Sequence, residues 1–312
     1  ALMLPLAVMP VTAQDYPVKP VTLIHGFGAG GNADTMSRII AEAMTEGLKQ
    51  RVIVEAKPGA AGTIAADLVA KAAPDGHTLV FLTAAHATTA NLYKNLKYDP
   101  VESFAMLSSV GFLPYVIAVR KDHPFQTLDD LIRFAREKPG AVSYTSVGVG
   151  SVPHLTGELL GSRAEIRMVH VPYRGGTAPM ADVLGGRVDV LIDTQTVSMP
   201  HIRAGTARGL AVTSANPWPG TPGLPTAATR LPGFEVMSWI GMATTRGTPG
   251  SVLARLNTEI NRVLTLPNVA TRLGDLGAEV RPSSAEAMRT LVKSEIERWG
   301  GVIRAAKIES AQ

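Results

Sequence analysis

Four glycine-rich turns are the features of this sequence best suited to binding chemistry. Each follows an apolar run and opens directly into a helical pattern, and the four read GFGAGGNADTMSR, KPGAAGTIAADLVAK, SVGVGSVPHLTGELL and YRGGTAPMADVLGG. Such a turn presents free backbone N–H groups and the positive end of a helix dipole to a ligand. A single turn is weak evidence, because glycine commonly ends helices. Four turns in equivalent positions predict a site for an anion such as a carboxylate.

The first turn also fits a competing interpretation. Residues Gly26 to Gly31 match G-x-G-x-x-G, and Glu55 follows about two dozen residues later, as in dinucleotide-binding folds. This pattern favours an NAD(P)-dependent oxidoreductase as the alternative function. Against that function, Glu55 leads into the second glycine turn, and the chain has no recognisable catalytic constellation. We therefore expect no cofactor.

The sequence has no strong catalytic or metal-binding motif. Its seven histidines are dispersed without H-E-x-x-H, and it has no cysteine, which removes thiolate ligands, thiol nucleophiles and disulfides. Ser146 lies in YTSVG, which lacks the leading glycine of a nucleophile elbow. We expect His154, three residues beyond Ser151, to form hydrogen bonds on a helix face or in a cleft rather than to act as a general base. The sequence therefore predicts no enzyme activity and no bound metal, with a hydrolase as a less favoured alternative.

Three titratable side chains adjoin the ends of apolar runs. His86 in TAAHATT is interpreted as either a ligand contact or an ordinary surface histidine. Arg174 in YRGG could hold a carboxylate through two hydrogen bonds, or form an ion pair between two parts of the protein. Asp193 could accept a hydrogen bond from a ligand hydroxyl or ammonium, orient Arg174, or cap the following helix.

Apolar runs that alternate with helical patterns must position these residues. The runs are VTLIH from Val21, RVIVEA from Arg51, HTLVFL from His77, VSYTS from Val142, MVHVPY from Met168, VDVLIDT from Val188 and ARGLAVTS from Ala207. This alternation predicts an α/β fold of mostly parallel sheets flanked by helices. In open parallel sheets ligands bind outside the carboxyl ends of the strands, where the glycine turns fall.

Two segments are natural places for the chain to cross between two lobes. The apolar stretch from Phe104 to Lys121 is too long for one strand, and the stretch from Asn216 to Pro232 is rich in proline. After it, EVMSWIGMATT is expected to return as a strand, and three helical stretches close the chain, the last beginning at Ser284 as its cap. We predict a discontinuous first lobe of residues 16–116 and 226–312, and a second lobe of residues 117–225.

The first residues and the composition indicate an exported protein. An apolar run from Leu2 to Val11 precedes small residues spaced for signal peptidase, so residues 1–13 are interpreted as a signal peptide remnant cleaved after Ala13. The run is too short to span a bilayer. The net charge of +4 comes from scattered Lys and Arg without an aromatic-interleaved basic stripe, so no nucleic-acid partner is expected.

Taken together, these stretches resemble the Bug, or tripartite tricarboxylate transporter receptor, family of periplasmic solute-binding proteins. The resemblance is carried in family order by GAGGNADTMSRIIAE, KPGAAGTIAADLVAKAAPDGHTL, SVGVGSVPHLTGELL, VPYRGGTAPMADVLGGRVDVLIDT, GLAVTS, LPGFEVMSWIGMATTRGTPGSVLARLN and EIERWGGVIRAAKI. It implies a two-lobed, type II-like Venus flytrap fold that holds ligand carboxylates with loop backbone and water and performs no chemistry. The implied partners are a small carboxylate and the membrane subunits of a tripartite transporter, or a sensor, and we expect a monomer.

The resemblance also implies the ligand-binding residues. From the first lobe they are Phe27, Gly28, Ala29, Gly30, Gly31, Asp34, Thr35, Thr83, Ala84, Ala85 and His86. From the second lobe they are Ser146, Gly148, Gly150, Ser151, His154, Tyr173, Arg174, Gly175, Gly176 and Asp193. The chain departs from the family where HGFGAGG lacks prolines around the aromatic residue, and where LPTAATRLPGF lacks an acidic residue after Pro-Thr. The ligand is therefore left open as a mono- or dicarboxylate, aliphatic, aromatic or amino acid.

Overall fold

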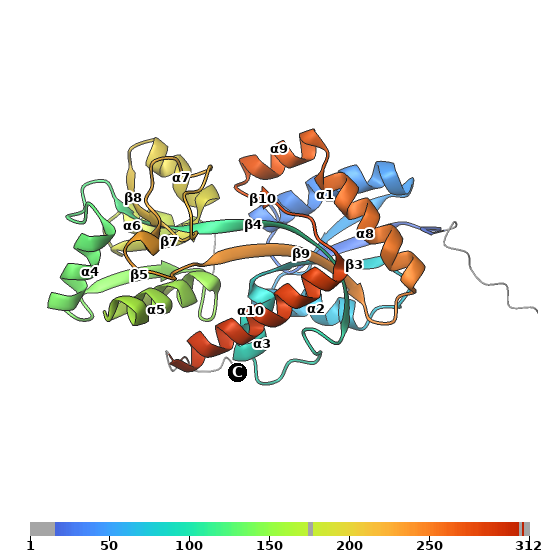
Figure 1. Ribbon diagram of the computed structural model, residues 1–312, viewed down its shortest axis with the longest axis horizontal. Helices are drawn as coiled ribbons and strands as arrows, with labels where there is room; N and C mark the ends of the chain where they lie inside the picture. Colours follow the sequence, from blue (N-terminus) through green and yellow to red (C-terminus); the bar gives the residue numbers. More distant parts are fainter. Residues whose placement is uncertain (1–15, 174–176, 306–307, 309–312) are drawn as a thin grey trace, which may run out of the picture.

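The computed structural model describes residues 16–173, 177–305 and 308. These residues form a ten-stranded mixed sheet whose main path runs β2-β1-β3-β9-β4-β7-β5-β6, with β8 and β10 also paired to β4. Figure 1 shows two lobes at the two ends of this sheet, each with helices on both faces, joined by the long strands β4 and β9. The two-lobed α/β architecture expected from the sequence is confirmed.

The first lobe contains the beginning and the end of the described chain. Strands β2, β1 and β3 are parallel, whereas β9 is antiparallel to both β3 and β4, and β10 is antiparallel to β4. The strands are β1 (Val21–His25), β2 (Val52–Ala56), β3 (Thr78–Thr83), β9 (Met237–Thr245), β10 (Glu279–Val280) and the first part of β4 (Phe104–Arg120). The helices are α1 (Asn32–Leu48), η2 (Ala60–Gly62), α2 (Thr63–Ala70), α3 (Ala85–Leu92), α8 (Gly250–Leu264), α9 (Pro267–Asp275) and α10 (Ala285–Ala305).

The second lobe repeats this plan with the middle of the chain. Strand β5 is parallel to β6 and β7, and the second part of β4 is antiparallel to β7 and β8. The strands are β5 (Val142–Ser146), β6 (Met168–Pro172), β7 (Val190–Thr194) and β8 (Ala207–Val212). The helices are α4 (Leu128–Glu137), α5 (Val152–Ala164), α6 (Ala178–Leu184) and α7 (Gln195–Arg203), and η3 (Ala227–Thr229) lies on the returning segment. Each lobe therefore has three parallel strands completed by antiparallel ones.

The expectation that Phe104 to Lys121 is too long for one strand is wrong. The segment is a single 17-residue strand, β4, which pairs with β9 as far as Pro114 and with β7 from Tyr115 onward. Its pairing with β9 shifts register at two irregularities, between Met106 and Ser108 and between Ser109 and Gly111. One strand can be this long because it serves two sheets in succession, and register shifts of this kind bend the backbone.

Helix α10 packs mainly on α3 and β4 of the first lobe and also contacts α5 of the second lobe. Ser284 caps it, because its Oγ accepts a hydrogen bond from the N–H of Ala287 at 3.1 Å. Met288, Val292 and Trp299 are fully buried, and burial of such side chains stabilises a fold by about 1.5–3 kcal/mol each. The predicted last helix, capped by Ser284, is confirmed and is described as far as Ala305.

Candidate functional site

The loops after the parallel strands of the two lobes approach one another. The side-chain amide of Asn32, at the start of α1, lies 3.5 Å from the Thr196 hydroxyl of α7 in the other lobe. Gly150 of the second lobe lies so close to α3 that an added Cβ would be 2.1 Å from the Leu92 side chain. The glycine loops of both lobes therefore face the region between the lobes, where a ligand would contact both.

The loop between β1 and α1 is held by a buried carboxylate. Asp34 accepts hydrogen bonds from the Gly30 N–H at 2.9 Å and from His25 Nε2 at 3.0 Å, and it pairs with Arg38 at 2.9 Å. The bond from Arg38, together with those from Gly30 and His25, lowers the pKa of Asp34 to about 2. Phe27 N–H donates to His25 Nδ1 at 3.4 Å, so Nδ1 is an acceptor and the ring hydrogen lies on Nε2. Asp34 thus fixes the loop and has its oxygens engaged.

This arrangement changes the part that Gly30 can play. Its φ of +76° is the left-handed conformation that glycine favours, but its N–H is already donated to Asp34. Gly31 N–H points to the Gly28 carbonyl at 3.4 Å, and the Thr35 hydroxyl donates to the Gly31 carbonyl at 3.1 Å. Within the described residues, no hydrogen bond uses the N–H groups of Gly28 and Ala29, so the loop can offer these donors in addition to the free N–H groups at the start of α1.

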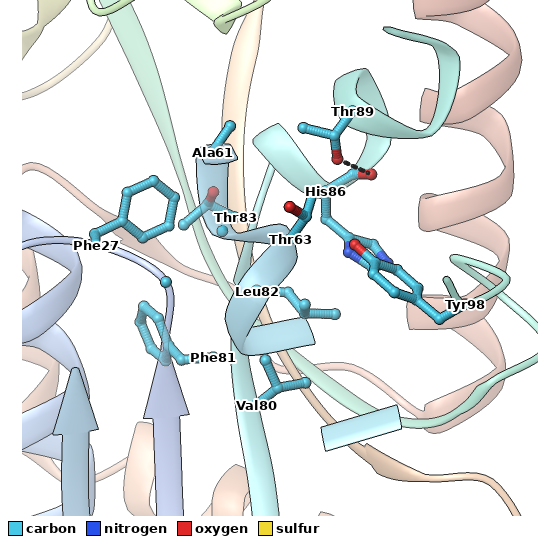
Figure 2. A pocket seen from close by; sticks show the side chains of 12 residues that line it. Phe27, Ala61, Thr63, Val80, Phe81, Leu82, Thr83, His86, Thr89 and Tyr98 are labelled. Carbon is cyan, nitrogen blue, oxygen red and sulfur yellow. Dashed lines mark hydrogen bonds between the residues drawn. The ribbon is translucent and has the colours of Figure 1, made fainter. Parts of the chain in front are cut away.

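A small pocket lies beside this loop in the first lobe (Figure 2). Phe27, Thr83 and His86 of the predicted set line it, and the other lining residues are Gly26, Ala61, Gly62, Thr63, Val80, Phe81, Leu82, Thr89 and Tyr98. Gly26 and Gly62 pack backbone to backbone, because a Cβ on Gly26 would lie 2.2 Å from Cα of Gly62. The second glycine turn, for which no site residue was predicted, therefore forms one wall of the pocket.

His86 is neither a surface histidine nor freely available to a ligand. It is 5% exposed, its Nε2 donates to the Pro100 carbonyl at 2.8 Å, and its ring stacks on Tyr98 with centroids 6.0 Å apart. Burial lowers the pKa of His86, so the ring is neutral. The neighbouring Ala84 is buried, Ala85 is half-buried, and Thr83 Oγ1 accepts from the Ala85 N–H at 3.4 Å.

The loop between β5 and α5 has an internal network of the same kind. Ser146 Oγ accepts from the Gly148 N–H at 3.0 Å, and His154 Nδ1 accepts from the Gly150 N–H at 3.0 Å. Ser151 caps α5 and donates its hydroxyl to the Gly148 carbonyl at 2.7 Å. The N–H groups of Val147 and Val149 are used in no hydrogen bond within the described part of the chain. These two residues are 42% and 57% exposed, so the loop can offer both of their N–H groups to a ligand.

Two further predicted residues are engaged within the second lobe. The Tyr173 hydroxyl donates to Asp182 at 2.6 Å, and burial followed by this bond raises the pKa of Tyr173 to about 12. Asp193 is 9% exposed, and burial raises its pKa to about 6, although the Thr194 N–H donates to it at 2.7 Å. This hydrogen bond lies directly before α7, and the N-cap residue of that helix is Thr194 rather than Asp193. Arg174, Gly175 and Gly176 lie outside the described residues.

Residues that no motif indicated connect the lobes next to these loops. Gln195 Nε2 donates to the Gly277 carbonyl at 2.7 Å, and the Thr196 hydroxyl donates to the Leu276 carbonyl at 2.5 Å. Gln195 fits between two glycines, since a Cβ on Gly220 or on Gly277 would lie 2.4 Å from its amide. Only the position of Gln195 directly after an apolar run could have indicated this role.

Alternative sites find little support in the described residues. Glu55, the acid that a dinucleotide site would use, forms an ion pair with Lys57 at 3.1 Å. In the described ranges no three His, Asp or Glu side chains are grouped to hold a metal ion. Likewise, none of the helices in those ranges is long and apolar enough to cross a membrane.

Comparison with known sequences gives a consistent result. Residues 36–308 match the family model described as tripartite tricarboxylate transporter family receptor. The chain is 38% identical over 299 residues to the UPF0065 protein in the tcbD-tcbE intergenic region of Pseudomonas sp. strain P51, covering 95% of this chain and 89% of that protein. It is 32% identical to protein BugT of Bordetella pertussis, covering 95% and 91%.

Comparison with solved structures points the same way. The periplasmic binding protein BugD is 35% identical, with a TM-score of 0.83 over 94% of this chain and 99% of BugD. Rpa4515 of R. palustris, solved with adipate, is 35% identical with a TM-score of 0.86 over 95% and 99%. MatC from Rhodopseudomonas palustris, solved with bound malate, is 33% identical with a TM-score of 0.82 over 92% and 100%.

Proposed function

Because this chain belongs to the tripartite tricarboxylate transporter receptor family, we propose that it captures a small organic carboxylate between its two lobes as a periplasmic solute-binding receptor. The observation that carries the proposal is the pair of glycine loops, one from each lobe. The N–H groups of Gly30, Gly148 and Gly150 are donated internally, and each loop leaves N–H groups of adjacent residues without an internal acceptor at the end of a parallel sheet.

Backbone donors of this kind suit a carboxylate. Within the described members of the predicted site no side chain is a cation, so the donors for an anion are backbone N–H groups at Gly28, Ala29, Val147 and Val149. The structural neighbours solved with adipate and malate hold dicarboxylates. A mono- or dicarboxylate is therefore the ligand class that we propose for this chain.

The role that follows is delivery rather than catalysis. The receptor passes its ligand to the membrane subunits of a transporter, or to a sensor, and acts as a monomer without enzyme activity. It reaches the periplasm after cleavage behind Ala13. The family membership supports this role, and nothing in the site favours the oxidoreductase alternative.

The division into two moving lobes is also part of the proposal. Residues 16–116 and 226–312 form one lobe and residues 117–225 the other. The change in the pairing of β4 from β9 to β7 between Pro114 and Tyr115 supports the first boundary, and the bridge between Val212 and Thr226 supports the second.

A thermal-shift screen of the protein tests the proposed function. The screen contains adipate, malate and other mono- and dicarboxylates, the matched neutral compounds adipamide and 1,6-hexanediol, and NADH and NADPH. At a hundred times its dissociation constant, a carboxylate stabilises the folded protein by about 2.7 kcal/mol, which raises the melting temperature by several degrees. A shift with a nicotinamide cofactor, or equal shifts with the neutral compounds, would contradict the proposal.

A further inference from the structure

The loop between β5 and α5 rests on two stacked imidazole rings. The ring centroids of His154 on α5 and His170 on β6 are 3.9 Å apart, with planes inclined by 19°. His170 also stacks against Tyr144 on β5, with the ring centroids 5.2 Å apart. His154 is 6% exposed and His170 is half-buried, so the stack belongs to the interior of the lobe.

The hydrogen bonds of His154 fix its tautomer. Gly150 N–H donates to Nδ1, which must therefore be unprotonated, and the ring hydrogen lies on Nε2. Nε2 is 3.9 Å from the Glu158 carboxylate, which also accepts the Tyr144 hydroxyl at 2.7 Å. A proton added at Nδ1 would place two donors face to face, and the bond to Gly150 would be lost.

His170 acts on the same loop through Ser146. Its Nε2 lies 2.5 Å from Ser146 Oγ, and that oxygen also accepts the Gly148 N–H and lies 3.0 Å from the Gly148 carbonyl. The orientation of the Ser146 hydroxyl is therefore set by His170 on one side and by Gly148 on the other. Through these two histidines, both glycines of the loop are fixed.

The surroundings keep the pair uncharged. Burial lowers the pKa of His154 to about 4, and burial together with the adjacent His154 lowers that of His170 to about 4, against a smaller raising effect of Glu158. Glu158 and Tyr144 are the titratable groups that face the stack. Farther out, Arg163, Glu235 and Arg298 line a groove with Glu158, and Asp189, directly before β7, is engaged with Ser143 and His123.

We propose that His154 and His170 are positioning residues for the β5–α5 loop: as a neutral stacked pair they hold Gly150 directly and Gly148 through Ser146, and acidification that protonates His154 at Nδ1 releases the loop at Gly150. The inference rests on the proposed function only in its consequence, which is that the carboxylate loses the donors at Val147 and Val149. The statement about the loop itself concerns the ligand-free protein.

Nuclear magnetic resonance of the 15N-labelled, ligand-free protein tests the proposal. At pH 5.5 a histidine with the ordinary pKa of about 6.5 is roughly nine-tenths charged, whereas one with a pKa near 4 is almost entirely neutral. We expect His154 and His170 to be neutral at pH 5.5, with the hydrogen of His154 on Nε2. Below pH 5 the amide signal of Gly150 should move together with the titration of His154, and that of Gly148 with the titration of His170.

Variants separate positioning from general stability. His154→Gln should remove the pH-dependent movement of the Gly150 signal, and His170→Asn that of Gly148, while His201→Gln on α7 should leave both unchanged. If either variant fails to fold, the pH titration of the wild-type protein by nuclear magnetic resonance still tests the proposal. Histidines already charged at pH 5.5, or glycine signals that do not follow them, would overturn the proposal. Because no ligand is present, the result is independent of whether the protein binds a carboxylate.

Discussion

The side-chain amide of Gln195 donates to the carbonyl oxygen of Gly277 at 2.7 Å and so joins the first turn of α7 to the loop before β10. The two residues belong to different lobes, and Gln195 is 5% exposed between Gly220 and Gly277. This contact would be broken if the lobes opened on this side, as the proposed movement of the two lobes requires. It therefore favours the closed form by the energy of the contact.

Gln195→Ala should shift the lobes toward an open form in the absence of ligand. Loss of one hydrogen bond changes the balance by about 1 kcal/mol, or roughly fivefold in the ratio of closed to open molecules. Small-angle scattering should then give a larger radius of gyration than for the wild type. Gln50→Ala, at a half-buried glutamine after α1, is the control. Equal radii for all three proteins would show that Gln195 does not hold the lobes together.

Gly30→Val should abolish ligand binding while costing no more stability than the same change elsewhere. A matched control is Gly223→Val, since Gly30 and Gly223 have φ of +76° and +79° and an added Cβ meets nothing within 4 Å at either. Both variants carry the same backbone strain, but only the first places bulk at the ligand loop. The ligand-induced rise in melting temperature should vanish in Gly30→Val and persist in Gly223→Val.

Gly148→Val should likewise remove most of the ligand-induced shift, whereas Arg174→Ala should weaken binding by about 1–3 kcal/mol, as expected for one charge-assisted bond. Gly148 has a φ of +125°, and a Cβ added to it would lie 3.6 Å from the Tyr173 carbonyl oxygen, an ordinary van der Waals contact. Isothermal titration with the carboxylate found in the screen measures both effects. Normal binding by folded Gly148→Val together with no binding by Arg174→Ala would mean that side-chain charge, rather than loop backbone, holds the ligand.

The free energy of unfolding should fall as the pH decreases from about 6.5 to 4. In this window the unfolded chain binds protons at His154 and His170, whereas the folded protein, with both pKa values near 4, does not. The slope reaches up to about 1.4 kcal/mol per pH unit for each histidine. Urea unfolding at pH 7, 6 and 5 should show a flatter dependence in the His154→Gln/His170→Asn double variant. The same slope in both proteins would contradict the lowered pKa values.

The contribution of Asp193 to the free energy of unfolding should have the opposite pH dependence, and Asp193→Asn should remove it. Burial raises the pKa of Asp193 to about 6, so its stabilising contribution is complete below pH 3.8 and is lost as the pH rises through 6. The loss corresponds to about 3 kcal/mol at pH 7. The asparagine variant should therefore gain stability over the wild type at pH 7 but not at pH 4, as measured by urea unfolding. Asp275→Asn, at an exposed aspartate ending α9, should show no such difference.

The parts of this fold that could be predicted from sequence are those with local signals. The strands before the glycine turns, and the left-handed backbone of Gly30 and Gly148, follow from patterns a few residues long. The contact of Ser146 with His170 spans 24 residues, and that of Gln195 with Gly277 spans 82. No spacing rule links such pairs, because only the tertiary fold brings them together.

The same distinction applies to the donors at the site. The sequence predicts free N–H groups at the glycine turns but not which residues supply them, and internal acceptors, Asp34 and Ser146, take the N–H groups of Gly30 and Gly148. Which N–H remains free depends on side-chain orientation around each turn. Residue type and spacing alone do not determine it.

Strand β4 has a consequence for how the chain can change in length. On it, Ile117 and Val119 point to one core of the second lobe, and Val116 and Ala118 point to the other. Because side chains alternate along a strand, removing one residue before Tyr115 would exchange these two sets while the first lobe kept its own pairing with β9. The register of β4 with β9 in the first lobe therefore determines which of its side chains face each core of the second lobe. A one-residue deletion in β4 is therefore expected to disturb the packing of the second lobe even though the deleted residue lies in the first.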